Sequence, residues 1–186
     1  MSEACIVTYT GVLFDILNPK PEMINIVDIA HSGSQMNRFT GHCRVPYPVT
    51  QHERLGSYLI DDSYLALWFL LHDASESYIS DMSRPLKHFT AAGQAYMKVE
   101  APLQTMIYEK FGLYGPEPPI VHEVDNLMLY AEKEQLMAPT KWPTKWSDER
   151  AAGVKIVETS FYDNKRMYLD RFWELYHGDW RRHTWL

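Results

Sequence analysis

The segment LLHDASESYISDMSRPLK, residues 70–87, holds the side chains whose types and spacing could do chemistry. The adjacent His72 and Asp73 follow the apolar run ALWFLL, and Glu76 comes about one helical turn later. Three more charged residues come next along the chain, namely Asp81, Arg84 and Lys87. An imidazole beside a carboxylate, with further carboxylates and cations nearby, suits a metal ion that acts on a phosphate ester.

Two residues outside this segment could complete a metal site. His52 is expected on the preceding helix and Asp125 on a later one, so helix packing could bring both to the His72-Asp73 pair. The resulting set of two imidazoles and two carboxylates is His52, His72, Asp73 and Asp125. Mixed nitrogen and oxygen ligands suit a divalent ion, and its identity stays open among Co, Zn, Mn, Fe and Mg.

The charged residues around this set have expected roles. A bound ion lowers the pKa of its water toward ~7 and polarises a phosphoryl oxygen. Glu76 is then the acid/base that orients the water or relays its proton. Asp81 could hold that network, or cap the segment that leads to Pro85. Arg84 and Lys87 neutralise the oxygens of a substrate phosphate. The alternative for these two cations is a solvated turn without a ligand.

Composition narrows the classes of protein. The chain has 186 residues, 46% of them apolar and 23% charged, which is ordinary for a globular domain. Its net charge of −6 argues against stable nucleic-acid binding. Two cysteines, Cys5 and Cys43, are too few for a disulfide scaffold and favour a cytoplasmic setting. No signal peptide is evident, and the longest apolar run, 65–71, is too short to span a membrane.

Hydrophobic periodicity and turn residues predict a mostly helical chain behind a small hairpin. Residues 6–17, rich in β-branched and aromatic types, form the hairpin with Thr10-Gly11 in its turn. Helices are expected over 24–36, 51–60, 64–79, 91–111, 120–137, 148–157 and 160–176. Thr50 is the expected cap of the second helix, with Glu53 in the capping-box position, and Pro102 should kink or restart the fourth. The predicted fold class is therefore all-α with an N-terminal β-hairpin.

These residues together resemble the HD-domain metal-dependent phosphohydrolases. The family pattern is a histidine, a His-Asp pair and a distant aspartate, here His52, His72-Asp73 and Asp125. An extended form, HDASE…D…P.K, is present within residues 72–87. The resemblance covers roughly residues 8–137. It implies a single HD-type helical domain over residues 1–186, in which 138–186 form a C-terminal helical extension.

The chain is most similar to compact phage-type members of that family. The similarity lies in a front hairpin YTG..FD.L.P, a D.AH segment and an RF.GH loop, at residues 9–19, 28–31 and 38–42. It implies roles in the substrate pocket for loop residues: Arg38 contacts phosphate, Phe39 packs near the sugar or base, and His42 lines the rim. Phe39 could equally be a core aromatic. Relatives often carry a basic residue three positions before the last aspartate, where this chain has His122, a candidate phosphate contact through a hydrogen bond or when protonated.

The resemblance implies a dATP triphosphohydrolase, which releases deoxyadenosine and triphosphate by attack of a metal-activated water on the α-phosphorus. One alternative is a 5'-deoxynucleotidase that acts on deoxynucleoside monophosphates. Another is a non-catalytic HD-like module that binds a nucleotide. The resemblance also implies a homo-oligomer, to which aromatic residues beyond Pro139 could contribute, and a setting in the host cytoplasm if the protein is phage-encoded.

Overall fold

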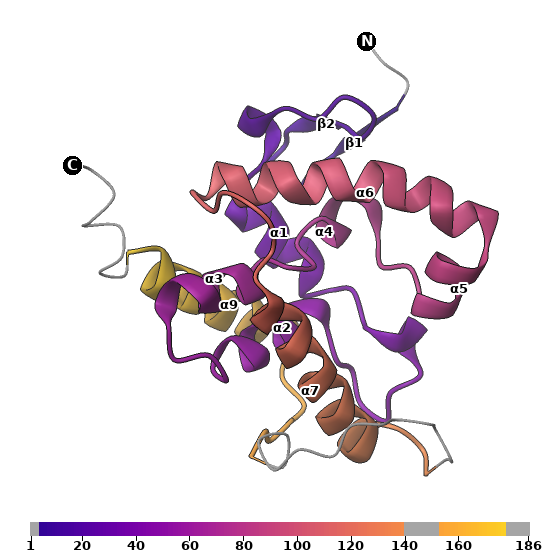
Figure 1. The fold of residues 1–186 in the computed structure, drawn as a ribbon, viewed down its shortest axis with the longest axis vertical. Coiled ribbons are helices and arrows are strands. Elements are labelled where there is room, and N and C mark those ends of the chain that lie inside the picture. The colour runs from indigo at the N-terminus through magenta and orange to yellow at the C-terminus, as the bar shows by residue number, and fades with distance from the viewer. Residues whose placement is uncertain (1–3, 140–152, 178–186) are drawn as a thin grey trace.

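The computed structural model describes residues 4–139 and 153–177 (Figure 1). Within these ranges the chain is mostly helical, with one two-stranded antiparallel sheet near the N-terminus. In chain order the elements are β1 (Cys5–Val7), β2 (Leu13–Asp15), η1 (Pro21–Met23), α1 (Ile26–Gly33), η2 (Phe39–Gly41), α2 (Val49–Ser57), α3 (Ser63–Leu70), α4 (Glu76–Ile79), α5 (Arg84–Phe89), α6 (Ala91–Lys110), α7 (Pro119–Leu136) and α9 (Phe161–Tyr176). The predicted class, all-α with a small β-hairpin, is confirmed.

The hairpin packs on the helical body through more than one aromatic contact, and the buried one is made by Phe14. Strands β1 and β2 pair with Ile6 opposite Phe14. Gly11 takes a φ of +84° in the turn, a left-handed conformation that glycine adopts without steric cost. Phe14 is fully buried and stacks on Tyr78 of α4, with the ring centroids 4.2 Å apart. The hairpin therefore rests on the same short helix that begins with Glu76.

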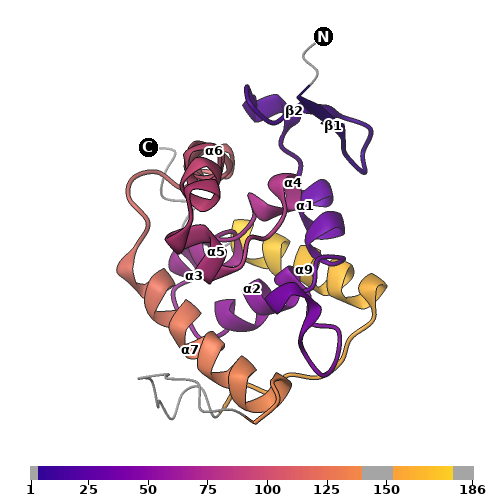
Figure 2. The ribbon, with the colours of Figure 1, turned by 90° about the vertical axis from the view of Figure 1, so that its right-hand side faces the viewer.

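Helices α2, α3 and α9 pack against one another in the middle of the molecule. Helix α3 begins at the N-cap Asp62, whose carboxylate accepts a hydrogen bond from Leu65 N at 2.8 Å. Its sequence SYLALWFL is apolar on nearly every side, as expected for a helix that is surrounded by others. In the two views at right angles, α6 crosses one side of this group and α7 lies on the other (Figures 1 and 2). The residues that follow the buried helix α3 therefore lie between α6 and α7.

The predicted single helix over 64–79 is wrong, because it is interrupted at 71–75. Helix α3 ends at Leu70, and the next turns wind through shorter i to i+3 bonds, such as Ala74 N to Leu71 O at 3.1 Å. Gln104 of α6 holds this turn: its Nε2 donates to Leu71 O at 2.6 Å and its Oε1 accepts from Ser75 N at 3.0 Å. These side-chain bonds replace the backbone bonds that a continuous helix would have made. His72 and Glu76 therefore do not share one helical face.

Other element ends differ from the predictions for local reasons. Helix α2 begins after Pro48, so the expected cap Thr50 lies inside the helix, where its hydroxyl bonds the Ser34 hydroxyl at 2.9 Å. Pro102 neither ends nor restarts α6, which runs unbroken from Ala91 to Lys110. The sequence did not predict the short helix α5. This helix begins at Arg84 and has Pro85 in its first turn, where a proline is tolerated.

The predicted helix over 148–157 is not found at 153–157, which has no helical structure, and its remainder lies outside the described residues. Most of the aromatic residues of the C-terminal region also lie outside the described residues, namely Trp142, Trp146, Trp180 and Trp185. Helix α9 matches the prediction for 160–176, with the Ser160 side chain accepting a hydrogen bond from Asp163 N. Among the helices of 4–139 and 153–177, none is both long and apolar enough to cross a bilayer.

Candidate metal centre and active-site pocket

Two histidines from different elements meet at the centre of the candidate site. His52 lies on α2 and is fully buried, whereas His72 lies in the turn after α3 and is partly exposed. Their Nε2 atoms are 3.3 Å apart. The packing of α2 against α3 sets this distance, because Phe69 of α3 contacts the His52 ring, with centroids 5.7 Å apart.

The other ring nitrogen of each histidine has a partner that fixes the tautomer. His72 Nδ1 lies 2.7 Å from the carbonyl oxygen of Phe69, which can only accept, so Nδ1 carries the proton. His52 Nδ1 lies 2.6 Å from Oε1 of Glu132, a buried carboxylate on α7. In the neutral forms both Nε2 atoms therefore present lone pairs to each other. Two lone pairs at this separation repel unless a proton or a metal ion is shared between them.

Two carboxylates stand beside the imidazole pair. Asp73 Oδ2 lies 3.3 Å from His72 Nε2 and 4.0 Å from His52 Nε2. Asp125 of α7 brings its Oδ1 to 3.5 Å from His52 Nε2. Burial alone would raise the pKa of Asp73, but His72 and then Arg38 outweigh it and hold that pKa below its usual range. Asp73 is therefore ionised, as a metal ligand must be.

This donor set fits a metal ion. Single ligand atoms of His52, His72 and Asp73 all lie within 4.8 Å of one another, so these three residues could hold one ion. Asp125 lies beside this trio through its contact with His52. Nitrogen and oxygen ligands in this mixture suit a divalent transition metal. The four residues expected from the sequence as ligands are thus brought together from α2, the turn at 71–75 and α7.

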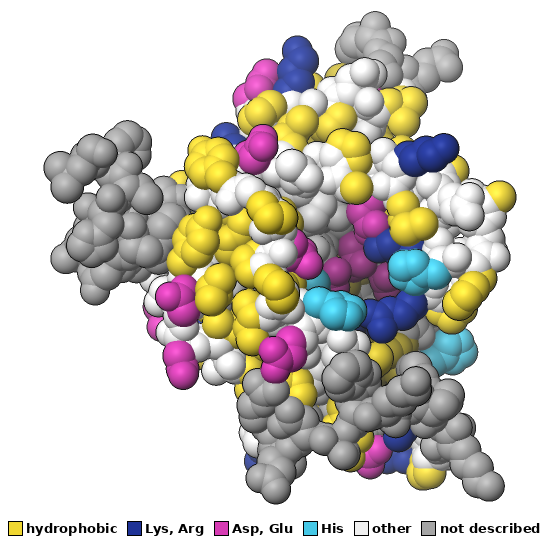
Figure 3. Space-filling view, viewed as in Figure 1, with side chains coloured by type: hydrophobic (Ala, Val, Ile, Leu, Met, Phe, Trp, Pro, Cys, Tyr) yellow, Lys and Arg dark blue, Asp and Glu magenta, His cyan; other side chains and the backbone are white. Residues whose placement is uncertain are grey.

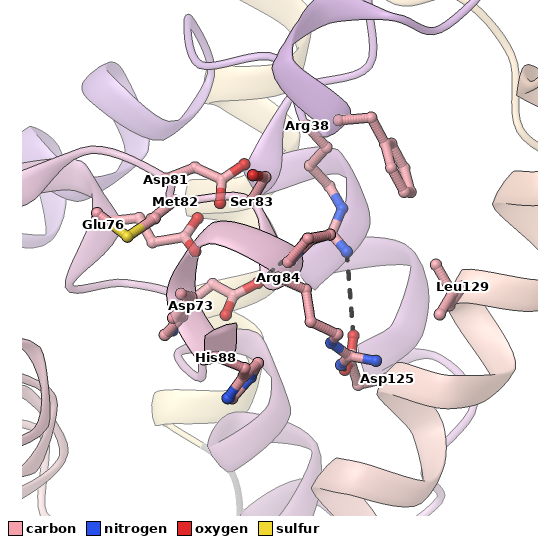
Figure 4. Close-up of a pocket in the computed structure, with 13 residues that line it drawn as sticks. Arg38, Asp73, Glu76, Asp81, Met82, Ser83, Arg84, His88, Asp125 and Leu129 are labelled. Carbon is pink, nitrogen blue, oxygen red and sulfur yellow. Dashed lines mark hydrogen bonds and ion pairs between the residues drawn. The ribbon is translucent and has the colours of Figure 1, made fainter. Parts of the chain in front are cut away.

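A pocket of about 300 Å³ opens over the two carboxylates. Charged side chains and histidines gather around a hollow on the face seen in Figure 3. In Figure 4, Glu76 and Asp81 lie on one side of the pocket and Asp125 on the other, with Asp73 between them. Phe39, Met82, Pro85 and Leu129 add apolar surface to the lining. Such a mixture of apolar walls and a few polar groups is typical of small-ligand sites.

Glu76 and Asp81, the expected acid/base and its support, both line this pocket. Burial raises the pKa of Glu76 well above its usual value, and the nearby Asp73 and Asp81 raise it further. Burial also raises the pKa of Asp81, which Arg38 partly opposes. Among the described residues, Glu76 Oε2 has no hydrogen-bond partner although it is buried. Glu76 is therefore a carboxyl group that can carry a proton next to the metal candidates.

Two bacterial proteins are similar to this chain, while no family model matches it. The uncharacterized protein YfdR of Escherichia coli (strain K12) is 36% identical over 135 residues, which cover 69% of this chain and 70% of YfdR. The chain belongs to the YfdR family. The uncharacterized protein RCAP_rcc00048 of Rhodobacter capsulatus is 31% identical over 139 residues, covering 68% of this chain and 70% of that protein.

The expected phosphate ligands of this YfdR-family chain line the pocket but already face carboxylates. Arg38 Nη1 bonds Asp73 Oδ2 at 3.0 Å. Arg84 Nη2 bonds Asp125 Oδ2 at 3.0 Å, and Lys87 Nζ bonds Glu100 Oε1 at 2.7 Å. Each cation would therefore have to share its charge between a protein carboxylate and a phosphate. Arg38 and Arg84 also hold the two aspartates of the candidate metal site.

The RF.GH loop presents two of its predicted residues to the pocket and turns a third away. Arg38 and Phe39 line the pocket, whereas His42 is exposed and is not among the described lining residues. Phe39 and Thr40 both have a φ of +55°, which is uncommon for residues other than glycine and costly for a β-branched one. Strain of this kind clusters at functional sites of proteins.

His122 does not occupy the position expected of a phosphate contact. It is exposed on α7, lies outside the described lining of the pocket, and its Nε2 is 3.1 Å from the side-chain amide of Asn126. Positions three apart are neighbours on a helix, so the spacing from Asp125 does not exclude His122; its exposed side chain lies against Asn126 instead. The YfdR-family site described here therefore has no contribution from His122.

Two buried acids around the site were not identified from the sequence. Glu132 contacts His52, and Glu53 lies beneath Asp73, whose backbone N–H donates to it. Glu132 follows Asp125 by seven positions, about two helical turns, so it shares a face of α7 with that residue and could have been found. Glu53 directly follows His52, and its spacing from Thr50 predicted a capping role instead. Burial and Asp73 raise the pKa of Glu53 well above its usual value.

Proposed function

We propose that this chain is a metal-dependent phosphohydrolase that cleaves the 5' phosphate ester of a deoxynucleotide. The observation that carries the proposal is the pair of imidazole Nε2 atoms 3.3 Å apart, with the carboxylates of Asp73 and Asp125 beside them at the floor of a pocket. Resemblance to the HD-domain phosphohydrolases, in the same residues, supports the assignment of that pair as ligands. When bound, a divalent ion would supply an activated water and polarise a phosphoryl oxygen.

The protein's own groups have separate tasks in this proposal. Glu76 can accept or give a proton at its Oε2, since its pKa is raised and this atom has no partner among the described residues. Asp81 lines the pocket beside Glu76 and supports its orientation. Arg38, which bonds Asp73 in this structure, would bind the non-bridging phosphate oxygens if Asp73 served as a metal ligand. Phe39 offers an apolar surface to the sugar or base.

The leading substrate is dATP, through the resemblance to phage-type triphosphohydrolases. One observation favours a second candidate, a 5'-deoxynucleotidase that acts on monophosphates. The three described cations of the pocket each face a carboxylate, and His122 lies elsewhere. A triphosphate brings more negative charge than these shared cations neutralise well, whereas a single phosphate needs fewer contacts. We also propose that the protein acts in the cytoplasm and forms a homo-oligomer.

Product analysis separates the candidates. The purified chain is incubated with dATP or dAMP and with Mn²⁺, Co²⁺ or Zn²⁺, and the products are identified by chromatography. Deoxyadenosine with triphosphate from dATP supports the leading substrate. Orthophosphate from dAMP without turnover of dATP supports the second candidate. No hydrolysis of either nucleotide with any of these metals contradicts both, and favours a nucleotide-binding module.

A further inference from the structure

We propose that Glu132 is the positioning residue of the candidate metal centre, which orients the His52 ring and directs its Nε2 lone pair toward the ion. The inference rests on the proposed metal site and adds a residue that neither the sequence pattern nor the resemblance identified. Glu132 touches no ligand position itself. It acts through His52, from the side of the ring that faces away from the pocket.

The contacts of Glu132 are those of a fixed acceptor. Its side chain is 0% exposed. One oxygen, Oε1, accepts two hydrogen bonds, from His52 Nδ1 at 2.6 Å and from the Tyr47 hydroxyl at 2.9 Å. Tyr47 is itself fully buried, so it has no solvent to turn toward and holds the carboxylate in one orientation. A buried acid with two short donors on one atom has little freedom to move.

This arrangement fixes the protonation of the ring. A carboxylate can only accept, so the proton of neutral His52 resides on Nδ1 and Nε2 is left as a donor of electrons. A negative partner on Nδ1 also raises the basicity of the other nitrogen, as carboxylate–histidine–metal triads do in general. Without Glu132, either nitrogen could carry the proton, and one of the two tautomers cannot bind a metal through Nε2.

The second oxygen of Glu132 links the same residue to the pocket. Oε2 lies 3.6 Å from Arg38 Nη2, and among the described residues it has no hydrogen-bond partner. Arg38 also bonds Asp73, one of the candidate ligands. Glu132 would thus remain an ion-pair partner for Arg38 if Asp73 served as a metal ligand. The Glu132 carboxylate therefore both orients His52 and pairs with Arg38.

The test compares Glu132→Gln with the matched control Glu134→Gln. The control changes the same residue type on the same helix, at a side chain that is 53% exposed and paired with Lys133. Calorimetric titration with Mn²⁺ should show a loss of affinity of about 10- to 100-fold for Glu132→Gln and none for the control. Equal affinities for a folded Glu132→Gln and the unaltered protein would overturn the proposal.

A second measurement needs neither a metal nor a folded Glu132 variant. Nitrogen-15 spectra of the imidazoles in the metal-free protein, with His52 assigned through a His52→Gln variant, report which ring nitrogen carries the proton. The proposal requires protonated Nδ1 and unprotonated Nε2, and the opposite tautomer would refute it. If the unaltered protein binds no Mn²⁺, Co²⁺ or Zn²⁺, the proposed metal site fails, while the tautomer still decides the role of Glu132.

Discussion

His52 and His72 approach each other with their Nε2 atoms 3.3 Å apart, although they come from a helix and from the turn after another helix. The Nδ1 atom of each ring also has a hydrogen-bond partner, which is Glu132 for His52 and the Phe69 carbonyl for His72. The approach of the two rings is not a local consequence of the sequence, since His52 and His72 are twenty positions apart. In the neutral forms the fold holds two lone pairs against each other, and a shared proton or a bound metal ion would remove their repulsion.

Removal of the His72 imidazole should weaken metal binding strongly. We expect His72→Ala to lower the affinity for Mn²⁺ by more than about 100-fold, because even an outer partner of a ligating histidine is worth about 10- to 100-fold. His122→Ala is the control, since that histidine is exposed on α7 and bonds Asn126. Calorimetric titration measures both. A loss of equal size in the control would mean that His122 does contribute to the site.

Glu76→Gln should separate catalysis from stability. Burial raises the pKa of Glu76, so its neutral form is favoured and an amide of the same shape should be tolerated. We expect an unchanged melting temperature and a fall in kcat of about 100- to 10,000-fold, the usual contribution of a general acid or base. Full activity in a folded Glu76→Gln protein would remove this residue from the mechanism.

The crossing of α2 and α3 should tolerate no added atom. A Cβ at Gly56 would overlap the ring of Phe69, whose carbonyl holds His72. Gly56→Ala should therefore destabilise the fold by about 1–3 kcal/mol, as overpacked cores do. Gln94→Ala, at an exposed position of α6, should stay within about 0.5 kcal/mol. Denaturant titration measures both variants, and equal stabilities would show that α2 and α3 can separate.

His31 should make the fold sensitive to mild acid. Burial lowers its pKa, Lys165 lowers it further and Asp28 partly opposes them. Below the unfolded value of about 6.5 the unfolded chain binds a proton that the folded chain resists, so stability is lost as the pH falls.

His31→Phe would test this effect, because it keeps an aromatic ring beside Tyr9 and Phe161 but cannot titrate. Between about pH 7.5 and 5.5 the melting temperature of the unaltered protein should fall more than that of the variant. Parallel curves for the two proteins would assign the acid sensitivity to other groups.

Much of the fold followed from patterns that are local in the sequence. The hairpin, α7 and α9 were predicted because turn residues, caps and prolines mark their ends directly. The continuous helix over 64–79 was predicted wrongly, because the apolar run and Glu76 fit one periodic pattern. Its interruption depends on Gln104, a side chain from α6 that no local pattern connects to the turn.

In the candidate site, too, some residues could be predicted from the sequence and others depend on tertiary packing. His52, the His72-Asp73 pair and Asp125 could be identified as ligand types, and the fold brings them together. The acids behind the ligands were not assigned. The seven-residue spacing places Glu132 on the same face of α7 as Asp125, but nothing local in the sequence shows that this glutamate is buried. The cation partners, such as Glu100 for Lys87, likewise depend on the packing of α5 on α6.

The most direct test of the metal centre is anomalous diffraction from crystals grown with Co²⁺ or Zn²⁺. We expect one strong peak bounded by the Nε2 atoms of His52 and His72 and by the carboxylates of Asp73 and Asp125. The Asp73→Asn variant should lose that peak under the same conditions. A protein that shows no peak there, or that binds its ion elsewhere, would show that these four residues do not form a metal centre.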